Sequence, residues 1–392
     1  MLPLQGVTVV SLEQAVAAPF TTRQLADLGA RVIKIERPQV GDFARAYDQT
    51  VLGQSSHFVW LNRSKESLTL DVKHPDAKAI LERLLVKADV FVQNLVPGAA
   101  ARLGLSSEAL VQRHPRMIVC NISGYGPDGP YSQKKAYDLL IQCESGVVSV
   151  TGTPDTPSKA GISIADIAAG MYGYSGILTA LYQREKTGKG AAFDVSMFEA
   201  LGEWMGYPAY FAAYGGKPPP RTGAAHATIH PYGPFPAGNG KTVFFGIQNE
   251  REWAGFCMTV LEKPELAEDP RFSGSSNRDA NREALTRIIV DVFSRMTDEQ
   301  IIARLDAAQI ANSRLNDMQA FWNHPQLTAR GRWREVDSPG GRIQALLPPV
   351  NLDDGEPRMD PIPSVGQHTR AILLELGFDQ AFVARLQREK AI

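Results

Sequence analysis

A chain of 392 residues with 41 basic and 42 acidic side chains carries a formal net charge of −1, which leaves no basic surplus for a nucleic-acid partner. Three scattered cysteines exclude a disulfide framework, the N-terminal segment lacks the pattern of a secretion signal, and no run approaches the ~18 apolar residues of a membrane span. Length and a hydrophobic content of 44% therefore predict a cytoplasmic globular protein of two domains, without a membrane or nucleic-acid partner.

The first third of the chain alternates short β-type runs with longer helical patterns. Strands are expected at 6–12, 30–36, 89–95 and 116–123, and helices at 19–30, 75–88 and 108–115. Strands that alternate with helices pair in parallel and carry helices on both faces. This pattern predicts a doubly wound, Rossmann-like α/β domain, in which ligands sit beyond the carboxyl ends of the strands.

The middle of the chain changes in character. Residues 165–190 predict one long helix whose many small residues allow close packing against another helix or another subunit, and 192–215 continues as a strand and a helix. Residues 214–223 have the composition of a linker, and 232–249 predict antiparallel strands around the turn Asn239-Gly240. Helices follow at 249–261 and 298–309, and a last helix at 367–378.

These segments define the expected domains. We expect the N-terminal part of a large α/β domain at 1–200, a linker at 201–222, a smaller α+β domain at 223–312, an irregular return linker at 313–345, and the C-terminal part of the large domain at 346–392.

The familiar short catalytic motifs are absent, including glycine-rich phosphate loops and the nucleophile-elbow serine. His226 and His230 are four residues apart, which would suit two metal ligands on one helix. Their segment is loop-like and offers no nearby Glu or Cys to complete a tetrahedral site, so no metal is expected.

Residues 134–170 are the most informative stretch, with four carboxylates. Asp155 lies in the turn composition TPDTP, which favours a turn role. Asp166 follows the β-type run GISIA and opens the small-residue helix, so it is expected at a strand-to-helix corner. Two interpretations stay open there. Asp166 caps the helix N-terminus, or it is a carboxylate nucleophile kept ionised by the helix dipole and facing a ligand cleft.

Seven blocks, in order along nearly the whole chain, resemble the family III CoA-transferases, the family of formyl-CoA transferase, carnitine CoA-transferase and α-methylacyl-CoA racemase. They are AAPFTTRQLADLGARVIKIERPQVGD, LNRSKESLTLDVKHPDA, QNLVPGAAARLGL, NISGYGPDGPYSQKKAYD, ISIADIAAG, QREKTGKGAAFDVSMFEAL and GQHTRAILLELGF. The resemblance implies an interlocked homodimer whose large domains each unite the N- and C-terminal parts of one chain. It also implies that acyl-CoA and a small carboxylic acid are substrates and that no cofactor is permanently bound.

The resemblance further implies roles for individual residues. Asp166 matches the family's aspartate nucleophile, which forms a mixed anhydride and then an aspartyl-CoA thioester. Lys135, Tyr137 and Asp138 match positions that line the active site, although formyl-CoA transferase has Glu where this chain has Asp138. The positions that match CoA contacts are Val16, Ala17, Ala18, Arg37, Lys73, Asn94, Arg102 and Met197.

Departures from the family pattern bear on specificity. The family's racemases have His where this chain has Tyr137, and a phenol is a poor acid–base partner, so proton transfer is the weaker alternative. Residues 221–235 lack the consecutive glycines of formyl-CoA transferase and look more like relatives that use C4–C5 dicarboxylates such as itaconate. Candidate cations for a second carboxylate are Arg221, His226, His230 and Arg251. A non-catalytic CoA-binding protein is the alternative from a different class.

Overall fold

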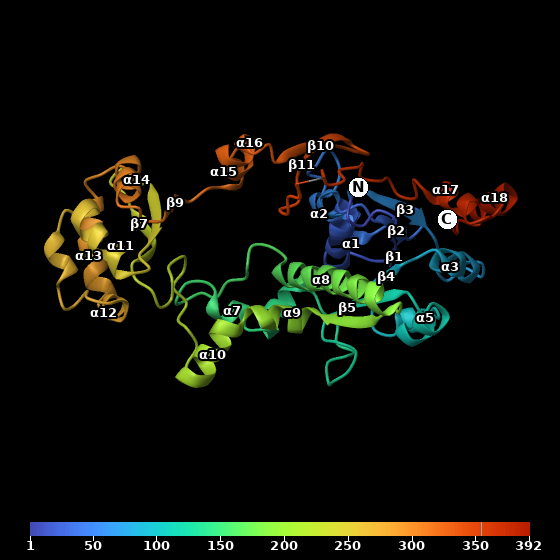
Figure 1. Ribbon diagram of the computed structural model, residues 1–392, viewed down its shortest axis with the longest axis horizontal. Coiled ribbons are helices and arrows are strands. Elements are labelled where there is room, and N and C mark those ends of the chain that lie inside the picture. Colours follow the sequence, from blue (N-terminus) through green and yellow to red (C-terminus); the bar gives the residue numbers. More distant parts are fainter. Residues whose placement is uncertain (354) are drawn as a thin grey trace. The chain divides into compact units, whose positions relative to one another are not determined.

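The computed structural model describes residues 1–353 and 355–392 (Figure 1). The chain divides into two compact units. The first unit contains residues 1–145, 160–205 and 326–392, so it unites both ends of the chain. The second unit contains residues 146–159 and 206–325, and the predicted small domain at 223–312 lies within it.

The first unit is built on a six-stranded sheet in the order β3-β2-β1-β4-β5-β6, and all five neighbouring pairs are parallel. This confirms the predicted parallel α/β architecture. The strands are β1 (Thr8–Leu12), β2 (Arg31–Glu36), β3 (Lys65–Thr69), β4 (Val90–Gln93), β5 (Ile118–Ser123) and β6 (Ala192–Ser196). Strand β3 was not predicted, because Lys65 and Glu66 break its apolar pattern. Lys65 is nevertheless buried, and it is paired with the buried carboxylate of Glu13 at 2.8 Å.

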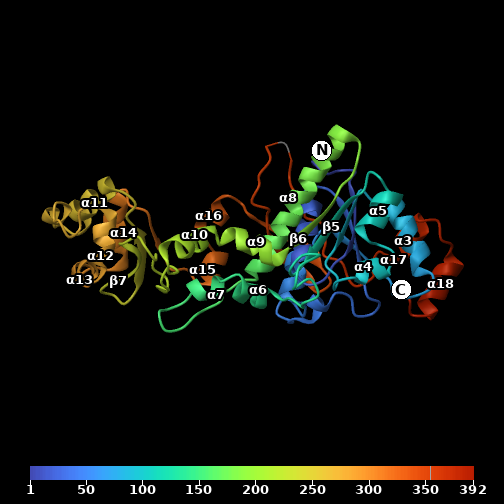
Figure 2. The same cartoon turned by 90° about the horizontal axis from the view of Figure 1, so that it is seen from below.

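Helices cover both faces of this sheet (Figures 1 and 2). One hydrophobic cluster joins α3, α5, α17 and α18 to alternate strand residues such as Val10, Ile33 and Phe91. On the other face, α1 packs against β2 and β4, and α8 packs against β5 and β6. The helices are α1 (Ala17–Asp27), η1 (Phe43–Ala46), α2 (Ser56–Leu61), α3 (Ala77–Val86), α4 (Ala99–Arg102), α5 (Ser107–Arg113), α6 (Asp138–Glu144), α8 (Ile164–Thr187), α9 (Met197–Trp204), α16 (Pro325–Ala329), α17 (Thr369–Glu375) and α18 (Gln380–Arg388).

Two predicted linkers contain regular structure. The stretch 201–222 holds the end of α9 and all of α10 (Gly206–Gly215). The stretch 313–345, expected to be irregular, contains α15 (Met318–Trp322), α16 and a hairpin of β10 (Trp333–Ser338) and β11 (Gly341–Leu346). The hairpin was missed because its apolar positions are few. Its core is Val336, which packs with Phe58 and Ile362 from segments distant in sequence.

The second unit combines a small antiparallel sheet with helices. Strands β7 (Tyr232–Pro236) and β8 (Thr242–Gly246) pair as predicted around the turn at Gly240, whose φ is +79°, and β9 (Asn312–Arg314) joins the edge. An aromatic core centred on Trp253, Phe256 and Phe293 packs beneath them. The helices are α7 (Val147–Val150), α10, α11 (Glu250–Gly255), η2 (Phe256–Val260, a π-helical turn), η3 (Pro264–Ala267), α12 (Ser275–Ala280), α13 (Arg282–Phe293), α14 (Asp298–Ala307) and α15.

None of the helices in the described part of the chain has both the length and the apolar character needed to cross a membrane.

Candidate active site

Asp166 lies in the first turn of α8, at the third helical residue. The run GISIA was expected to be a strand, but residues 160–163 form no strand and the helix already begins at Ile164. The β-type alternation of this short run was a weak signal, because the same apolar residues also fit the first turn of a helix. Asp166 is therefore an early helix residue and not the residue at a strand-to-helix corner.

Asp138, from a segment distant in sequence, caps α8. One of its oxygens accepts the backbone N–H groups of Ala165 at 2.8 Å and Asp166 at 3.4 Å, and the other accepts the amide of the buried Gln142 at 2.7 Å. Ser163, at the N-cap position, makes no such side-chain bond. The N-cap interpretation of Asp166 is thus wrong, since Asp138 performs that task and leaves the Asp166 carboxylate free of its own helix.

The carboxylate of Asp166 is partly buried and lies near the backbone N–H of Ala17, which lowers its pKa. Burial, and then the negative charge of Asp138, raise the pKa of Asp166 from 3.8 to about 7, while the Ala17 N–H opposes this rise. Ala17 is the first residue of α1, so its N–H is one of the donors that a helix leaves unsatisfied at its start. At neutral pH such a carboxyl exchanges readily between its acid and ionised forms, and its ionised form is more basic than an ordinary aspartate.

Close contact between α1 and α8 fixes this arrangement. A Cβ atom on Gly170 would lie 2.8 Å from the carbonyl oxygen of Ala17, and one on Gly173 would lie 2.7 Å from the hydroxyl of Thr21. The Thr21 hydroxyl donates to the carbonyl of Gly170 at 2.9 Å. The small residues noted in the sequence thus pack this helix against α1 of the same chain and bring the start of α1 to Asp166.

The residues matched to CoA contacts gather at one edge of the sheet. Each follows the carboxyl end of a parallel strand, where open α/β sheets bind ligands. In strand order they are Val16, Ala17 and Ala18 after β1, Arg37 after β2, Lys73 after β3, Asn94 and Arg102 after β4, and Met197 after β6. Arg37, Lys73 and Arg102 are exposed, whereas Val16, Ala17, Ala18 and Met197 are buried.

Tyr47 was missed in the sequence. Burial, followed by the charges of Asp42 and Asp166, raises its pKa to about 12, and Tyr137 also contributes. These effects place the Tyr47 phenol within electrostatic reach of Asp166, with its ring still half exposed. A tyrosine in a loop gives no local signal of such a neighbour. Tyr137, which precedes α6, and Lys135 are both exposed.

Arg221, His226 and His230 belong to the second unit and are engaged there. Arg221 donates to the carbonyls of Ser149, Thr153 and Pro154 at 3.1, 2.9 and 2.7 Å.

The two histidines are occupied as well. Nδ1 of His226 accepts the N–H of Ile229 at 3.0 Å, and its ring stacks on Tyr232. His230 is buried, its Nε2 lies 3.2 Å from the Thr286 hydroxyl, and burial lowers its pKa to about 4.

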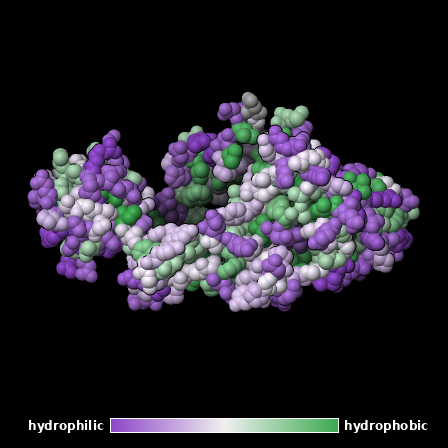
Figure 3. All heavy atoms as spheres, turned by 60° about the horizontal axis from the view of Figure 1, so that its bottom comes forward, coloured by the Kyte–Doolittle hydropathy of each residue, from purple (hydrophilic) through white to green (hydrophobic). Residues whose placement is uncertain are grey.

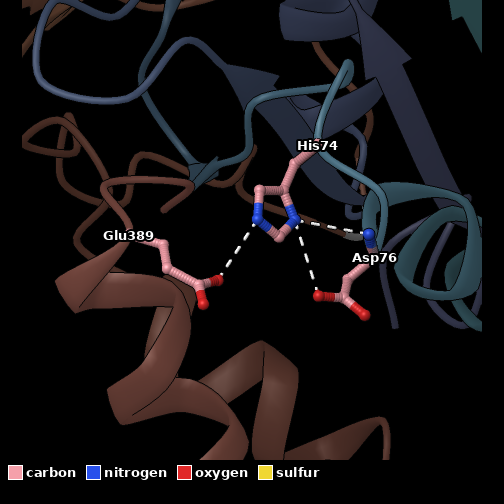
Figure 4. Close-up of side chains that lie close together, drawn as sticks. All are labelled: His74, Asp76 and Glu389. Atoms are coloured by element: carbon pink, nitrogen blue, oxygen red, sulfur yellow. Dashed lines mark hydrogen bonds and ion pairs between the residues drawn. The ribbon is translucent and has the colours of Figure 1, made fainter.

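A separate cluster has the composition of a metal site. His74, Asp76 and Glu389 bring their ligand-type atoms within 4.8 Å of one another (Figure 4). However, Arg385 pairs with Asp76 at 2.9 Å and with Glu389 at 3.1 Å, so both carboxylates are already engaged by one guanidinium group. The cluster fastens α18 to the loop that carries Lys73.

Comparisons with known proteins bear on this site. The family model described as CoA-transferase family III matches residues 4–369. The chain is 33% identical over 391 residues to the succinyl-CoA:glutarate CoA-transferase of Homo sapiens, covering 98% of this chain and 88% of that protein. It is 37% identical over 330 residues to the acetyl-CoA:oxalate CoA-transferase of Acetobacter aceti, covering 84% of each. The crystal structure of a CAIB/BAIF family protein from Brucella suis superposes with a TM-score of 0.83 at 33% identity, covering 96% of this chain and 99% of that one.

Proposed function

The chain belongs to the family III CoA-transferases and is a CoA-transferring enzyme, and from this premise we propose that it moves CoA from succinyl-CoA to a C4–C5 dicarboxylate such as itaconate, with Asp166 as a covalent relay. The proposal that Asp166 is the relay rests on the different positions of two carboxylates. Asp138 caps α8, and the partly buried Asp166 is left to react beside the start of α1.

The proposed reaction is a sequence of four acyl transfers. An ionised oxygen of Asp166 attacks the donor thioester carbonyl, the C–S bond breaks, and CoA leaves as a thiolate. The thiolate attacks the aspartyl carbonyl of the mixed anhydride and releases succinate, which leaves an aspartyl-CoA thioester. The acceptor carboxylate then attacks this thioester and expels CoA, and the thiolate finally attacks the acceptor's acyl carbon and frees Asp166. No net proton is consumed, and no thioester energy is lost provided that water is excluded.

The raised pKa of Asp166 suits this role. A carboxylate with a pKa of about 7 is a stronger nucleophile than an ordinary aspartate, yet a large part of it is ionised at neutral pH. The nearby N–H of Ala17 favours the ionised form of the carboxylate. For CoA, the exposed guanidinium groups of Arg37 and Arg102 are suited to forked contacts with nucleotide phosphates.

Two relatives frame the choice of acceptor. The human relative is named for glutarate, a five-carbon dicarboxylate, which favours a C4–C5 acceptor, and the Acetobacter relative is named for oxalate. Oxalate is therefore the second candidate, and Arg221, His226 and His230 are the proposed surroundings of the distal carboxylate. All three side chains already have hydrogen-bond partners within the second unit. We therefore propose that they affect acceptor binding indirectly, by fixing the conformation of the segment that carries them.

Exposed apolar surface supports a homodimer, which we propose is interlocked. No residue of α10 is buried, and its Tyr207, Tyr210 and Tyr214 are between 52% and 86% exposed. In the first unit, α8, the edge strand β6 and α9 form an open groove of about 690 Å³. Hydrophobic patches are visible among the polar side chains in Figure 3. Surfaces of this kind on a protein of balanced charge fit a second copy of the chain.

One experiment tests the relay directly. After incubation with succinyl-CoA, hydroxylamine should convert the acylated aspartate to a hydroxamate, and mass spectrometry should locate this at Asp166. Asp166→Asn should abolish both labelling and transfer, whereas the control Asp155→Asn, in an exposed turn, should change neither. Label at another carboxylate, or transfer by Asp166→Asn, would contradict the relay. Acceptor specificity is tested with succinyl-CoA as the donor and itaconate, glutarate, succinate analogues, oxalate and carnitine as acceptors. The dicarboxylate proposal is rejected if only oxalate or carnitine reacts.

A further inference from the structure

The loop between β1 and α1 is clamped by Asn94. The side-chain amide of Asn94 donates to the carbonyl of Gln14 at 2.9 Å, and its oxygen accepts the N–H of Gln14 at 2.9 Å. Asn94 directly follows β4, the neighbour of β1 in the sheet. Both polar atoms of the side chain are thus bonded to the backbone of one residue in the neighbouring loop.

Asp42 holds the next residue of the same loop. One oxygen of Asp42 accepts the N–H of Ala15 at 3.1 Å and that of Ala44 at 2.9 Å. The other oxygen is paired with the fully buried ammonium of Lys34 at 2.6 Å, and Asp42 is fully buried as well. A buried, paired carboxylate cannot turn away from its partners at small cost, so it is a rigid acceptor for the Ala15 N–H.

The residue between these clamps has an unfavourable backbone conformation. Ala15 has a φ of +62°, in the left-handed region, where the Cβ atom of an alanine crowds the backbone. Such a conformation persists only where the surroundings enforce it. Ala15 lies two residues before Ala17, which packs against Gly170 at the start of α8 and whose N–H is close enough to the Asp166 carboxylate to lower its pKa. If Ala15 relaxed to a negative φ, the peptide groups that follow would turn and that N–H would lose its aim.

We propose that Asn94 and Asp42 are positioning residues that hold Ala15 in its left-handed conformation and thereby aim the Ala17 N–H at Asp166. The inference rests on the proposed function and deepens it. It also assigns Asn94 a role different from the CoA contact implied by family resemblance, because its amide is committed to Gln14. Asn94 is the better residue to test, since its removal leaves no buried charge unpaired, as removal of Asp42 would.

Asn94→Ala and the neighbouring Gln93→Ala form a matched pair. Gln93 also uses its amide twice at the same sheet edge, but it bonds to Asn121 at 2.9 Å and to the N–H of Leu95 at 2.8 Å, and neither bond holds the β1–α1 loop. We expect Asn94→Ala to lower kcat by roughly 10- to 100-fold, as a misplaced reacting group does. The inhibition constant of 3′,5′-ADP, a CoA fragment without the thioester arm, should change by less than about twofold. Gln93→Ala should keep its kcat.

A rescue variant separates positioning from general damage. Glycine adopts a φ of +62° without the penalty of a Cβ atom, so Ala15→Gly added to Asn94→Ala should recover several-fold in kcat. Failure of that rescue in a folded double variant overturns the proposal. An Asn94→Ala variant with an unchanged kcat and a raised inhibition constant of 3′,5′-ADP also overturns it, because Asn94 would then be a CoA contact. An equal loss of kcat in Gln93→Ala overturns it as well. Failure of the proposed function shows instead as a wild-type protein that binds 3′,5′-ADP but transfers no CoA, and the inference then falls with it.

Discussion

Replacing Asp166, the proposed nucleophile, should make the protein more stable, and the gain in stability should depend on pH. In Asp166→Asn the partly buried carboxylate becomes a neutral amide of the same shape, which can still accept the N–H of Ala17. The change removes both causes of the raised pKa, which are the burial of a charge and its repulsion by Asp138. We therefore expect an inactive variant that is more stable than the wild type at alkaline pH.

The magnitude follows from proton linkage. A carboxyl with a pKa of 3.8 in the unfolded chain and about 7 in the folded protein destabilises the folded state by at most ~4 kcal/mol once ionised, since each tenfold change in proton affinity is worth ~1.4 kcal/mol. Because Asp166 is only partly buried, solvent screening reduces this, and about 2 kcal/mol is the expected gain. Below pH 3.8 the penalty is absent. It grows as the pH rises from 3.8 to 7, because the unfolded chain loses the proton first, and it is complete above pH 7.

Urea unfolding of the wild type and Asp166→Asn, at pH 5.5 and at pH 8.5, measures this difference. The stability advantage of the variant should be larger at pH 8.5, whereas the control Asp155→Asn should show no advantage at either pH. If the stability advantage of Asp166→Asn is absent, or is the same at both pH values, the ionised carboxylate of Asp166 does not destabilise the folded protein and the reasoning is refuted.

Two further expectations concern the cap and the assembly. Asp138→Asn keeps an oxygen that accepts the Ala165 N–H but removes a negative charge that raises the pKa of Asp166. The acid limb of the pH profile of kcat/KM should therefore move to lower pH. An acid limb at the same or a higher pH contradicts this expectation. Light scattering should give about twice the chain mass of 42.8 kDa, and Tyr210→Glu on the uncovered α10 should weaken the assembly; a monomeric wild type excludes the homodimer.

Much of the first unit is encoded locally. Buried parallel strands consist of short apolar runs, and helices that cover them repeat apolar residues at helical spacing, so the alternation along the first third of the chain predicted the sheet. Asp166 stood out for the same reason, as a carboxylate at the start of a helix rich in small residues. The strand β3 escaped because its Lys65 is buried through an ion pair with Glu13, which lies 52 residues away.

The sequence by itself determined that this is a parallel α/β protein and that Asp166 stands at the start of a long, small-residue helix, because both follow from the burial pattern of single segments. Only the tertiary structure decided what Asp166 can do. Asp138 reaches the start of α8 from 27 residues away and takes over its cap, and Gly170 lets the start of α1 approach Asp166. These partners meet through the packing of separate elements, and local periodicity carries no record of which elements will meet.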